Sequence, residues 1–169
     1  MDAAELRAMQ APIKEHYKQD PSAAVITLKA KGSSDSEGLT CKVETGRALA
    51  IAGLHPATGG SGLELCSGDM LLEALVACAG VTLKSVATAI EVPLKKAIVY
   101  AEGDLDFRGT LGLDKEAPVG FQEIRVRFEL QTDAPQDKLD LLQKLTERYC
   151  VVYQTIKNGP KVSVSMKRT

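Results

Sequence analysis

The spacing of hydrophobic and polar positions changes several times along the chain, and each change predicts a new element. Helical spacing over residues 2–19 gives way to strict alternation over 24–30, which returns over 39–43. A third apolar segment, residues 48–54, indicates a more buried strand, whereas the glycine-rich stretch 55–68 has no period. The first third of the chain therefore predicts one helix, three strands and a loop.

A long helix is predicted from Ser67 to about Ile90, with Pro93 closing it. Ser67 is a favourable cap, and Asp69 falls in the first turn, where the helix dipole favours a negative charge. Apolar side chains lie nearly all round this helix, at positions 71, 72, 75, 76, 79, 81, 83, 86 and 90. Such a helix must be covered on several sides. Because one sheet covers one side only, a second copy of the chain is a natural cover for another.

Two alternating strands follow, over residues 97–107 and 124–130, with an acidic polar face on the first and a mainly basic one on the second. Opposite charges on neighbouring strands favour cross-strand pairing. A helix is predicted over 133–150 with Asp133 as its cap, and a last strand over 162–166 with its apolar side chains inward. The order α-βββ-α-ββ-α-β is typical of an α+β fold with a mostly antiparallel sheet.

Composition narrows the class of protein. The 169 residues include 22 acidic and 21 basic ones, so no charge excess favours nucleic acid or an anionic membrane surface. With 44% apolar and 25% charged residues, the chain has the composition of one folded domain. The longest unbroken apolar run, residues 74–81, is far too short for a membrane span. The acidic N-terminus does not resemble a signal peptide, which predicts a cytoplasmic protein.

Most cofactor and metal motifs are missing. The glycines at 59, 60 and 62 lack the spacing of phosphate-binding or dinucleotide-binding loops, and no C-x-x-C pair exists. The cysteines and histidines are Cys41, Cys66, Cys78, Cys150, His16 and His55. A zinc site from His55, Cys66, Cys78 and Cys150 is conceivable by count, but nothing in the spacing supports it. We therefore expect neither a metal nor a cofactor.

The cysteine thiols remain as the candidate reactive groups of this chain. Cys41, Cys78 and Cys150 fall at apolar positions where a cysteine is most often a small core residue. Cys66 lies just before the long helix, whose N-terminal N–H groups lower the pKa of a nearby thiol. By this argument Cys66 is the most reactive thiol, although an exposed loop cysteine without a function is an equal alternative.

Two segments carry a resemblance to a known family. Residues 67–78 (SGDMLLEALVAC) resemble the central-helix cysteine motif of the OsmC/Ohr family, and residues 147–152 (ERYCVV) are similar to its second cysteine motif. The resemblance covers about residues 22–168, so residues 1–21 become a helical extension of a single domain over 1–169. It implies an α+β fold with a mostly antiparallel sheet, a long buried central helix and an intertwined homodimer.

The resemblance also implies an activity. The best-known members are thiol-dependent peroxidases that reduce organic hydroperoxides and hydrogen peroxide. Carried over, Cys78 is the peroxidatic thiol and Cys150 the resolving thiol, and a dithiol reductant restores both.

The family supports its peroxidatic thiol with an arginine from the early strands and a glutamate just before the central helix. Here Gly68 occupies the glutamate position, and Asp69 follows it. Arg47 is the only arginine between Arg7 and Arg108. Asp69 and Arg47 are therefore the candidate supporting residues.

Three hypotheses follow. The first is a thiol-dependent hydroperoxide reductase that uses Cys78 and Cys150 in oxidative stress defence. The second is a non-catalytic dimer that binds an apolar small molecule or partner in its interface cleft. The third is a redox sensor led by Cys66.

Overall fold

The computed structural model describes residues 3–34, 42–43, 52–63 and 65–168. Cys41, Arg47 and most of the strand predicted over 48–54 lie outside this part of the chain. The elements in chain order are α1 (Ala3–Gln19), the 3-10 turn η1 (Pro21–Ala24), β1 (Val25–Ser34), β2 (Lys42–Val43), β3 (Ala52–Gly53), the 3-10 turn η2 (Pro56–Thr58), β4 (Leu65–Cys66), α2 (Ser67–Ala89), β5 (Lys96–Asp106), α3 (Phe107–Thr110), β6 (Glu123–Gln131), α4 (Gln136–Tyr149) and α5 (Val151–Asn158).

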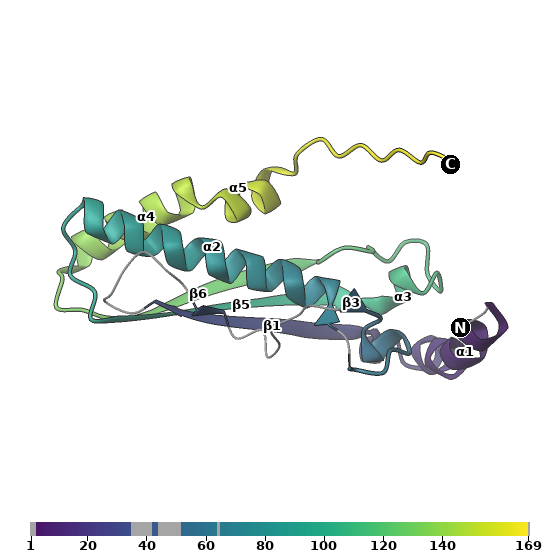
Figure 1. The fold of residues 1–169 in the computed structure, drawn as a ribbon. Coiled ribbons are helices and arrows are strands. Elements are labelled where there is room, and N and C mark those ends of the chain that lie inside the picture. Colours follow the sequence, from purple (N-terminus) through teal and green to yellow (C-terminus); the bar gives the residue numbers. More distant parts are fainter. Residues whose placement is uncertain (1–2, 35–41, 44–51, 64, 169) are drawn as a thin grey trace.

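An antiparallel sheet in the order β2-β1-β5-β6 forms one layer of the molecule (Figure 1). β5 pairs along its length with β1 on one side and β6 on the other. The predicted charge pairing is confirmed, because Glu102 lies opposite Arg125, whose guanidinium also donates to Asp104 at 2.6 Å. β3 and β4 form a separate, parallel pair. The predicted α+β class with a mostly antiparallel sheet is therefore confirmed.

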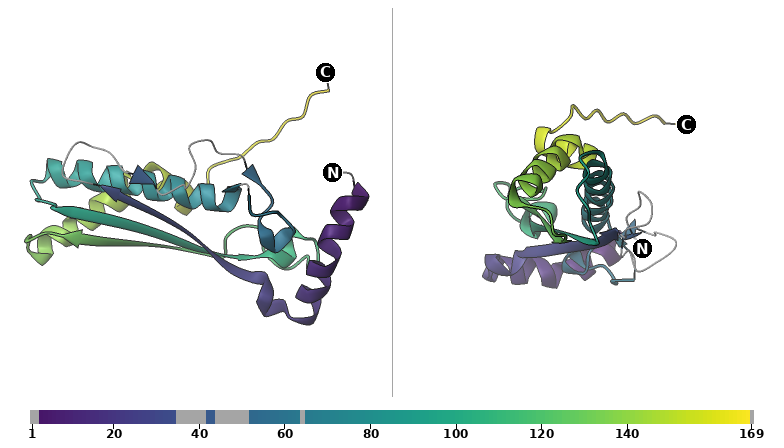
Figure 2. Two further views of the ribbon diagram at one scale, coloured as in Figure 1. Left: turned by 60° about the horizontal axis from the view of Figure 1, so that its bottom comes forward. Right: turned by 90° about the vertical axis from the view of Figure 1, so that its left-hand side faces the viewer.

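α2 lies lengthwise on the sheet, and α4 and α5 run beside it, so that the three helices form the second layer (Figure 2). The predicted helix over 67–90 is thus confirmed to within a residue. By length and composition alone, α2 could cross a membrane, but the core helix of a folded domain has the same properties. Here α2 packs against β1, β5, α4 and α5, and its buried side chains are Leu72, Leu75, Val76, Ala79, Leu83, Val86 and Ala87.

Two predicted caps were wrong. The residue that caps α2 is Cys66, with extended backbone, and Ser67 is the first helical residue. α4 begins after Pro135, whereas Asp133 forms an ion pair with Lys95 at 2.6 Å. In both cases, the polar side chain lies close to the helix start, but the backbone turns helical at a neighbouring residue.

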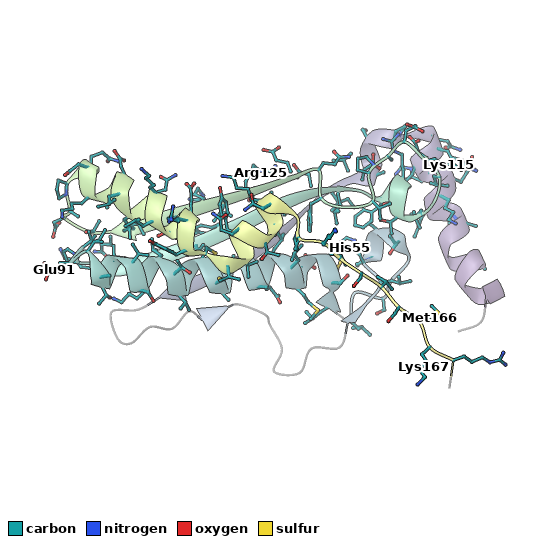
Figure 3. The ribbon with its side chains drawn as sticks, turned by 90° about the horizontal axis from the view of Figure 1, so that it is seen from above. His55, Glu91, Lys115, Arg125, Met166 and Lys167 are labelled. Atoms are coloured by element: carbon teal, nitrogen blue, oxygen red, sulfur yellow. The ribbon has the colours of Figure 1, made fainter. Side chains whose placement is uncertain are left out.

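The C-terminal region differs most from the prediction. Residues 151–158 form α5, although the sequence analysis predicts no element there. A single residue, Cys150, separates α5 from α4. The predicted strand over 162–166 is extended but pairs with no described strand of its own chain, and it projects away from the body (Figures 1 and 3). Its apolar side chains face outward, since Val162, Val164 and Met166 are 81%, 90% and 98% exposed.

Candidate active site

The fold brings Cys78 and Cys150 together although they are 72 positions apart in the sequence. Cys78 lies midway along α2, and Cys150 lies at the junction of α4 and α5. Cys78 packs against the core cluster that contains Cys150. The Cys150 thiol is one of the hydrogen-bonding groups that lower the pKa of Cys78. Both are free thiols, as is Cys66. The structure thus joins the two residues that the resemblance had paired.

The backbone around Cys150 explains how this junction faces Cys78. Cys150 is extended, with φ −71° and ψ 106°, so it ends α4 and caps α5 at once. Its own N–H donates to the Thr146 carbonyl at 2.9 Å, and its carbonyl accepts from Gln154 at 2.9 Å. The N–H groups of residues 151–153 precede this first intrahelical bond and therefore have no carbonyl partner within α5. They form a positive helix end at the cysteine pair.

The pKa of the Cys78 thiol lies below its ordinary value. Burial is the largest single influence and raises the pKa, but four hydrogen-bonding groups together outweigh it. They are, in decreasing order, the Val152 N–H, the Cys150 thiol, the Thr82 hydroxyl and the Val151 N–H. Thr82 is one helical turn beyond Cys78, so the two side chains lie next to each other on the same face of α2. Cys78 is therefore the thiol of the pair that ionises first.

Cys150 behaves in the opposite way. The pKa of its thiol is raised to about 11. Burial is the main cause and the neighbouring Cys78 adds to it, against opposing contributions from the N–H groups of Tyr153 and Val152. As the pH rises, Cys78 therefore loses its proton before Cys150 does. The arrangement holds a nucleophile and a proton donor in contact.

Asp69 does not support Cys78 within its own chain. The two residues are nine positions apart on α2, which is about 13 Å along the helix axis. Burial raises the pKa of the Asp69 carboxyl, and the charged form of His55 would oppose this. His55 accepts a hydrogen bond from the Ala57 N–H through Nδ1 at 3.0 Å and stacks on the Phe107 ring at 4.9 Å. Asp69 therefore belongs to a second polar cluster at the start of α2.

The other candidate residues have different outcomes. Arg47 and Cys41 lie outside the described residues, so their predicted roles stay predictions. Cys66 lies at the start of α2 as expected, but it takes the capping position predicted for Ser67, and its side chain accepts no capping hydrogen bond from the described N–H groups of that turn. Among the described residues, no three histidine, cysteine or carboxylate side chains are close enough together to hold a metal ion.

Sequence reasoning missed three groups beside Cys78: the Thr82 hydroxyl and the N–H groups of Val151 and Val152. Thr82 could have been found, since a residue four positions along a helix faces the same side. The two N–H groups have no sequence signature, because any residue except proline provides one.

A groove of about 800 Å³ adjoins the cysteine pair. It lies between β6, α4, α5 and one face of α2, and Cys150 is part of its lining. Its apolar wall consists of Leu75, Ala79, Leu83, Phe121, Ile124, Val126, Phe128, Leu130, Leu139, Leu142, Tyr153 and Ile156. The volume is that of a pocket for a small organic molecule.

Comparison with known proteins agrees with this geometry. The family model described as OsmC-like protein matches residues 60–165, a segment that contains both cysteines. Among solved structures, the fold is similar to that of an OsmC-like hydroperoxide resistance protein from Jannaschia sp. CCS1, with a TM-score of 0.63 and 14% sequence identity. That alignment covers 86% of this chain and 95% of the other. No curated protein matches the sequence.

Proposed function

Because the chain belongs to the OsmC-like protein family, we propose that it is a thiol-dependent peroxidase in which Cys78 reacts with hydroperoxides and Cys150 resolves the product. A peroxide-related role is the general expectation for the family, and the solved neighbour is named as a hydroperoxide resistance protein. The observation that carries the proposal is the contact between two thiols of opposite character, one inclined to ionise and the other to keep its proton.

In the first step, the Cys78 thiolate attacks the terminal oxygen of a hydroperoxide. The O–O bond breaks, Cys78 becomes a sulfenic acid and the leaving alkoxide needs a proton. The Cys150 thiol is the proton donor in contact with the reacting sulfur. Its raised pKa keeps that proton available at neutral pH.

In the second step, Cys150, now a thiolate, attacks the sulfur of the Cys78 sulfenic acid. The S–O bond breaks, hydroxide leaves and a Cys78–Cys150 disulfide forms. The two steps consume one hydroperoxide and yield one alcohol, one hydroxide and the disulfide. A dithiol then supplies the two electrons that return the enzyme to its starting state.

A homodimer is part of this proposal. Members of the family are generally dimeric, and two features of the chain support it. On α2, the stripe that contains Cys78 also holds Leu71 and Val81, which are 40% and 36% exposed. The extended segment at 160–168 offers alternating apolar side chains and unpaired backbone groups, which favours strand addition to a second copy. In such a dimer, any action of Asp69 on Cys78 would come from the partner subunit.

One alternative has an observation in its favour. The apolar groove could hold a small molecule in a dimer without catalytic activity, as the second hypothesis requires. The two functions differ in their need for sulfur. A binding module keeps its function when either cysteine becomes serine, whereas a peroxidase does not.

The test is hydroperoxide consumption by Cys78→Ser and Cys150→Ser with a dithiol in excess. We expect Cys78→Ser to lose turnover completely, because no nucleophile remains. In a separate reaction without the dithiol, Cys150→Ser should be oxidised once and retain a sulfenic acid, which dimedone labels and mass spectrometry assigns to Cys78.

Cys66→Ser is the matched control, since Cys66 is half-buried at the start of α2, the helix that carries Cys78, but outside the pair. It should keep turnover within about twofold of the unaltered protein, as expected for a substitution that leaves the reacting sulfurs in place. Turnover that persists in Cys78→Ser would refute the proposed function, and turnover lost only in Cys66→Ser would favour the redox-sensor hypothesis.

A further inference from the structure

His55 closes a tight turn at the end of the molecule that carries α1, away from the cysteine pair (Figure 3). Its carbonyl accepts hydrogen bonds from the Thr58 N–H at 2.8 Å, from the Thr58 hydroxyl at 2.9 Å and from the Gly60 N–H at 3.1 Å. Its imidazole folds back over the turn, where Nδ1 accepts from the Ala57 N–H at 3.0 Å. The turn is therefore closed by both the backbone and the side chain of one residue.

The same turn holds α1 on the body of the protein. Tyr17, which is 4% exposed, donates its hydroxyl hydrogen to the Ala57 carbonyl at 2.9 Å. Tyr17 and Phe107 belong to one small apolar cluster, and the Phe107 ring stacks on the His55 ring at 4.9 Å. Ala57 thus joins the two groups, because its N–H is bound by His55 and its carbonyl by Tyr17.

The hydrogen bond from Ala57 fixes the protonation state of the imidazole. Nδ1 can accept from an N–H only while it carries no proton, so the neutral ring holds its hydrogen on Nε2. A second proton would turn Nδ1 into a donor that faces the Ala57 N–H. The charged form of His55 is therefore incompatible with the closed turn.

The carboxylates on α2 do not offset this incompatibility. Asp69, in the first turn of α2, attracts a positive charge on His55, and Glu73 is one helical turn beyond Asp69. Burial of the ring outweighs the attraction of Asp69, so the pKa of His55 lies below its ordinary value. Burial also raises the pKa of both carboxyls. The neutral form of His55 is thus the one that suits its surroundings.

The remaining ionisable neighbours belong to α1 and α3. At the start of α3, Arg108 pairs with Asp106 at 2.5 Å and with Asp114 at 3.4 Å. On α1, burial raises the pKa of Tyr17, which therefore keeps its proton, and the ring of the exposed His16 lies 5.9 Å from the Tyr17 ring. Because histidine is the residue type that changes charge near pH 6, a comparison of the two histidines isolates the contribution of the turn.

We propose that His55 is an acid-sensitive latch for α1, whose protonation opens the turn at residues 55–58 and releases Tyr17 from the apolar cluster. The inference is independent of the proposed peroxidase cycle. The turn and α1 also precede the segment that matches the family model, residues 60–165. The latch is therefore a feature of this chain beside the family domain.

The direction of the pH effect follows from linkage. In the open turn the imidazole is exposed and has the ordinary pKa of about 6.5, whereas in the closed turn its pKa is lower. The closed turn is fully favoured above about pH 6.5. As the pH falls from there toward the lowered pKa, the open form gains up to about tenfold per pH unit.

The experiment is hydrogen exchange of the full-length protein between pH 8 and pH 5, followed by mass spectrometry and corrected for the intrinsic exchange rate at each pH. Protection of residues 13–19 of α1 should fall about five- to tenfold between pH 6.5 and 5.5. Residues 72–83, in the buried part of α2, should stay protected and so exclude global unfolding. Constant protection of residues 13–19, or a parallel loss in both segments, would overturn the inference.

His55→Asn tests whether the proton on this ring is responsible. Asparagine at this position keeps an acceptor for the Ala57 N–H but does not titrate, so protection of α1 should change less than about twofold over the same pH range. His16→Gln is the matched control, since His16 is the only other histidine of the chain, and it should keep the acid-dependent loss. A loss that persists in His55→Asn, or disappears in His16→Gln, would contradict the latch.

A second measurement uses the unaltered protein, because His55→Asn also removes the ring contact with Phe107. Imidazole ¹⁵N chemical shifts should show the Nε2–H tautomer of His55 at pH 8, and the titration of His55 should coincide with the loss of α1 protection. An Nδ1–H tautomer, or a titration that is complete while α1 is still protected, would overturn the inference even if the variant fails to fold.

Discussion

The chain contains two helix starts that are each preceded by a cysteine, and they differ in how the helix end is used. Cys66 caps α2, a helix of 23 residues, and Asp69 occupies its first turn. Cys150 caps α5, which has eight residues and no acidic side chain in its first turn. At α5, the N–H groups of residues 151 and 152 instead act on Cys78, which belongs to α2. The start of the longer helix, α2, therefore has the Asp69 carboxylate in its first turn, whereas the start of the shorter helix, α5, acts on the sulfur of Cys78.

This difference shows that sequence adjacency is a poor guide to which thiol a helix end activates. The dipole argument assigns the effect to the residue immediately before the helix, which favours Cys66. Hydrogen bonds from N–H groups act over a few ångströms. The thiol whose pKa is lowered is therefore the one that the fold places beside the first turn of the helix. Beside the first turn of α5, that thiol is Cys78, which belongs to α2.

The largest expected effect is the difference between the alkylation rates of Cys78 and Cys150. At pH 7.5, a pKa of about 11 leaves roughly one Cys150 in 3,000 ionised, whereas even an ordinary thiol is about one-tenth ionised. Allowing for the lower nucleophilicity of a less basic thiolate, Cys78 should react with iodoacetamide about 20-fold faster than Cys150. Peptide mapping after timed quenching measures both rates.

The alkylation rate of Cys78 should depend on pH in a direction that follows from its lowered pKa. Because the pKa of Cys78 is lowered, its alkylation rate should reach a plateau at a lower pH than that of a free cysteine. Cys66 provides the comparison between the two helix starts. If Cys66 were alkylated ahead of Cys78, the longer helix end would be the activating one, contrary to our interpretation.

A smaller effect is expected from Thr82→Val, which removes one hydroxyl beside the sulfur and keeps the shape of the side chain. Loss of a hydrogen bond of about 1 kcal/mol should slow Cys78 alkylation at neutral pH about fivefold. Thr88→Val is the matched control, because Thr88 is on the same helix and donates to the Lys84 carbonyl. Equal slowing by both variants would indicate a general change in α2.

The smallest effect should come from Val151→Pro, which removes a single N–H from the start of α5. Proline is well accepted at the first helical position, so α5 should persist. We expect Cys78 alkylation to slow about threefold, since Val151 is the weakest of the four groups that lower the Cys78 pKa. Val151→Ala keeps the N–H and should match the unaltered protein, and circular dichroism verifies the helix in both.

Much of the fold was predictable because it depends on local patterns. The apolar stripe of α2 and the opposite charges of β5 and β6 define their elements without reference to the rest of the chain, and both predictions are confirmed. α5 was missed because it has no side-chain cap and only eight residues. Its signal was Val152 and Ile156, which are one turn apart and pack against the core cluster.

The site was predictable in part. The resemblance paired Cys78 with Cys150, and the structure brings them into contact. Asp69 lies elsewhere in its own chain because a helix is rigid, so nine residues impose a fixed separation. The Thr82 hydroxyl and the two N–H groups depend on the packing of α5 against α2, which no local pattern encodes.

The extended segment at 160–168 has a consequence for how the protein should unfold. In the homodimer that we propose, the second chain would cover Val162, Val164 and Met166, so part of the folding free energy would be available only on association. Mass action would then make the melting temperature rise with protein concentration. At high dilution the same exposed strand is a site for non-native pairing, so the thermal stability of this protein should be a property of its abundance as much as of its sequence.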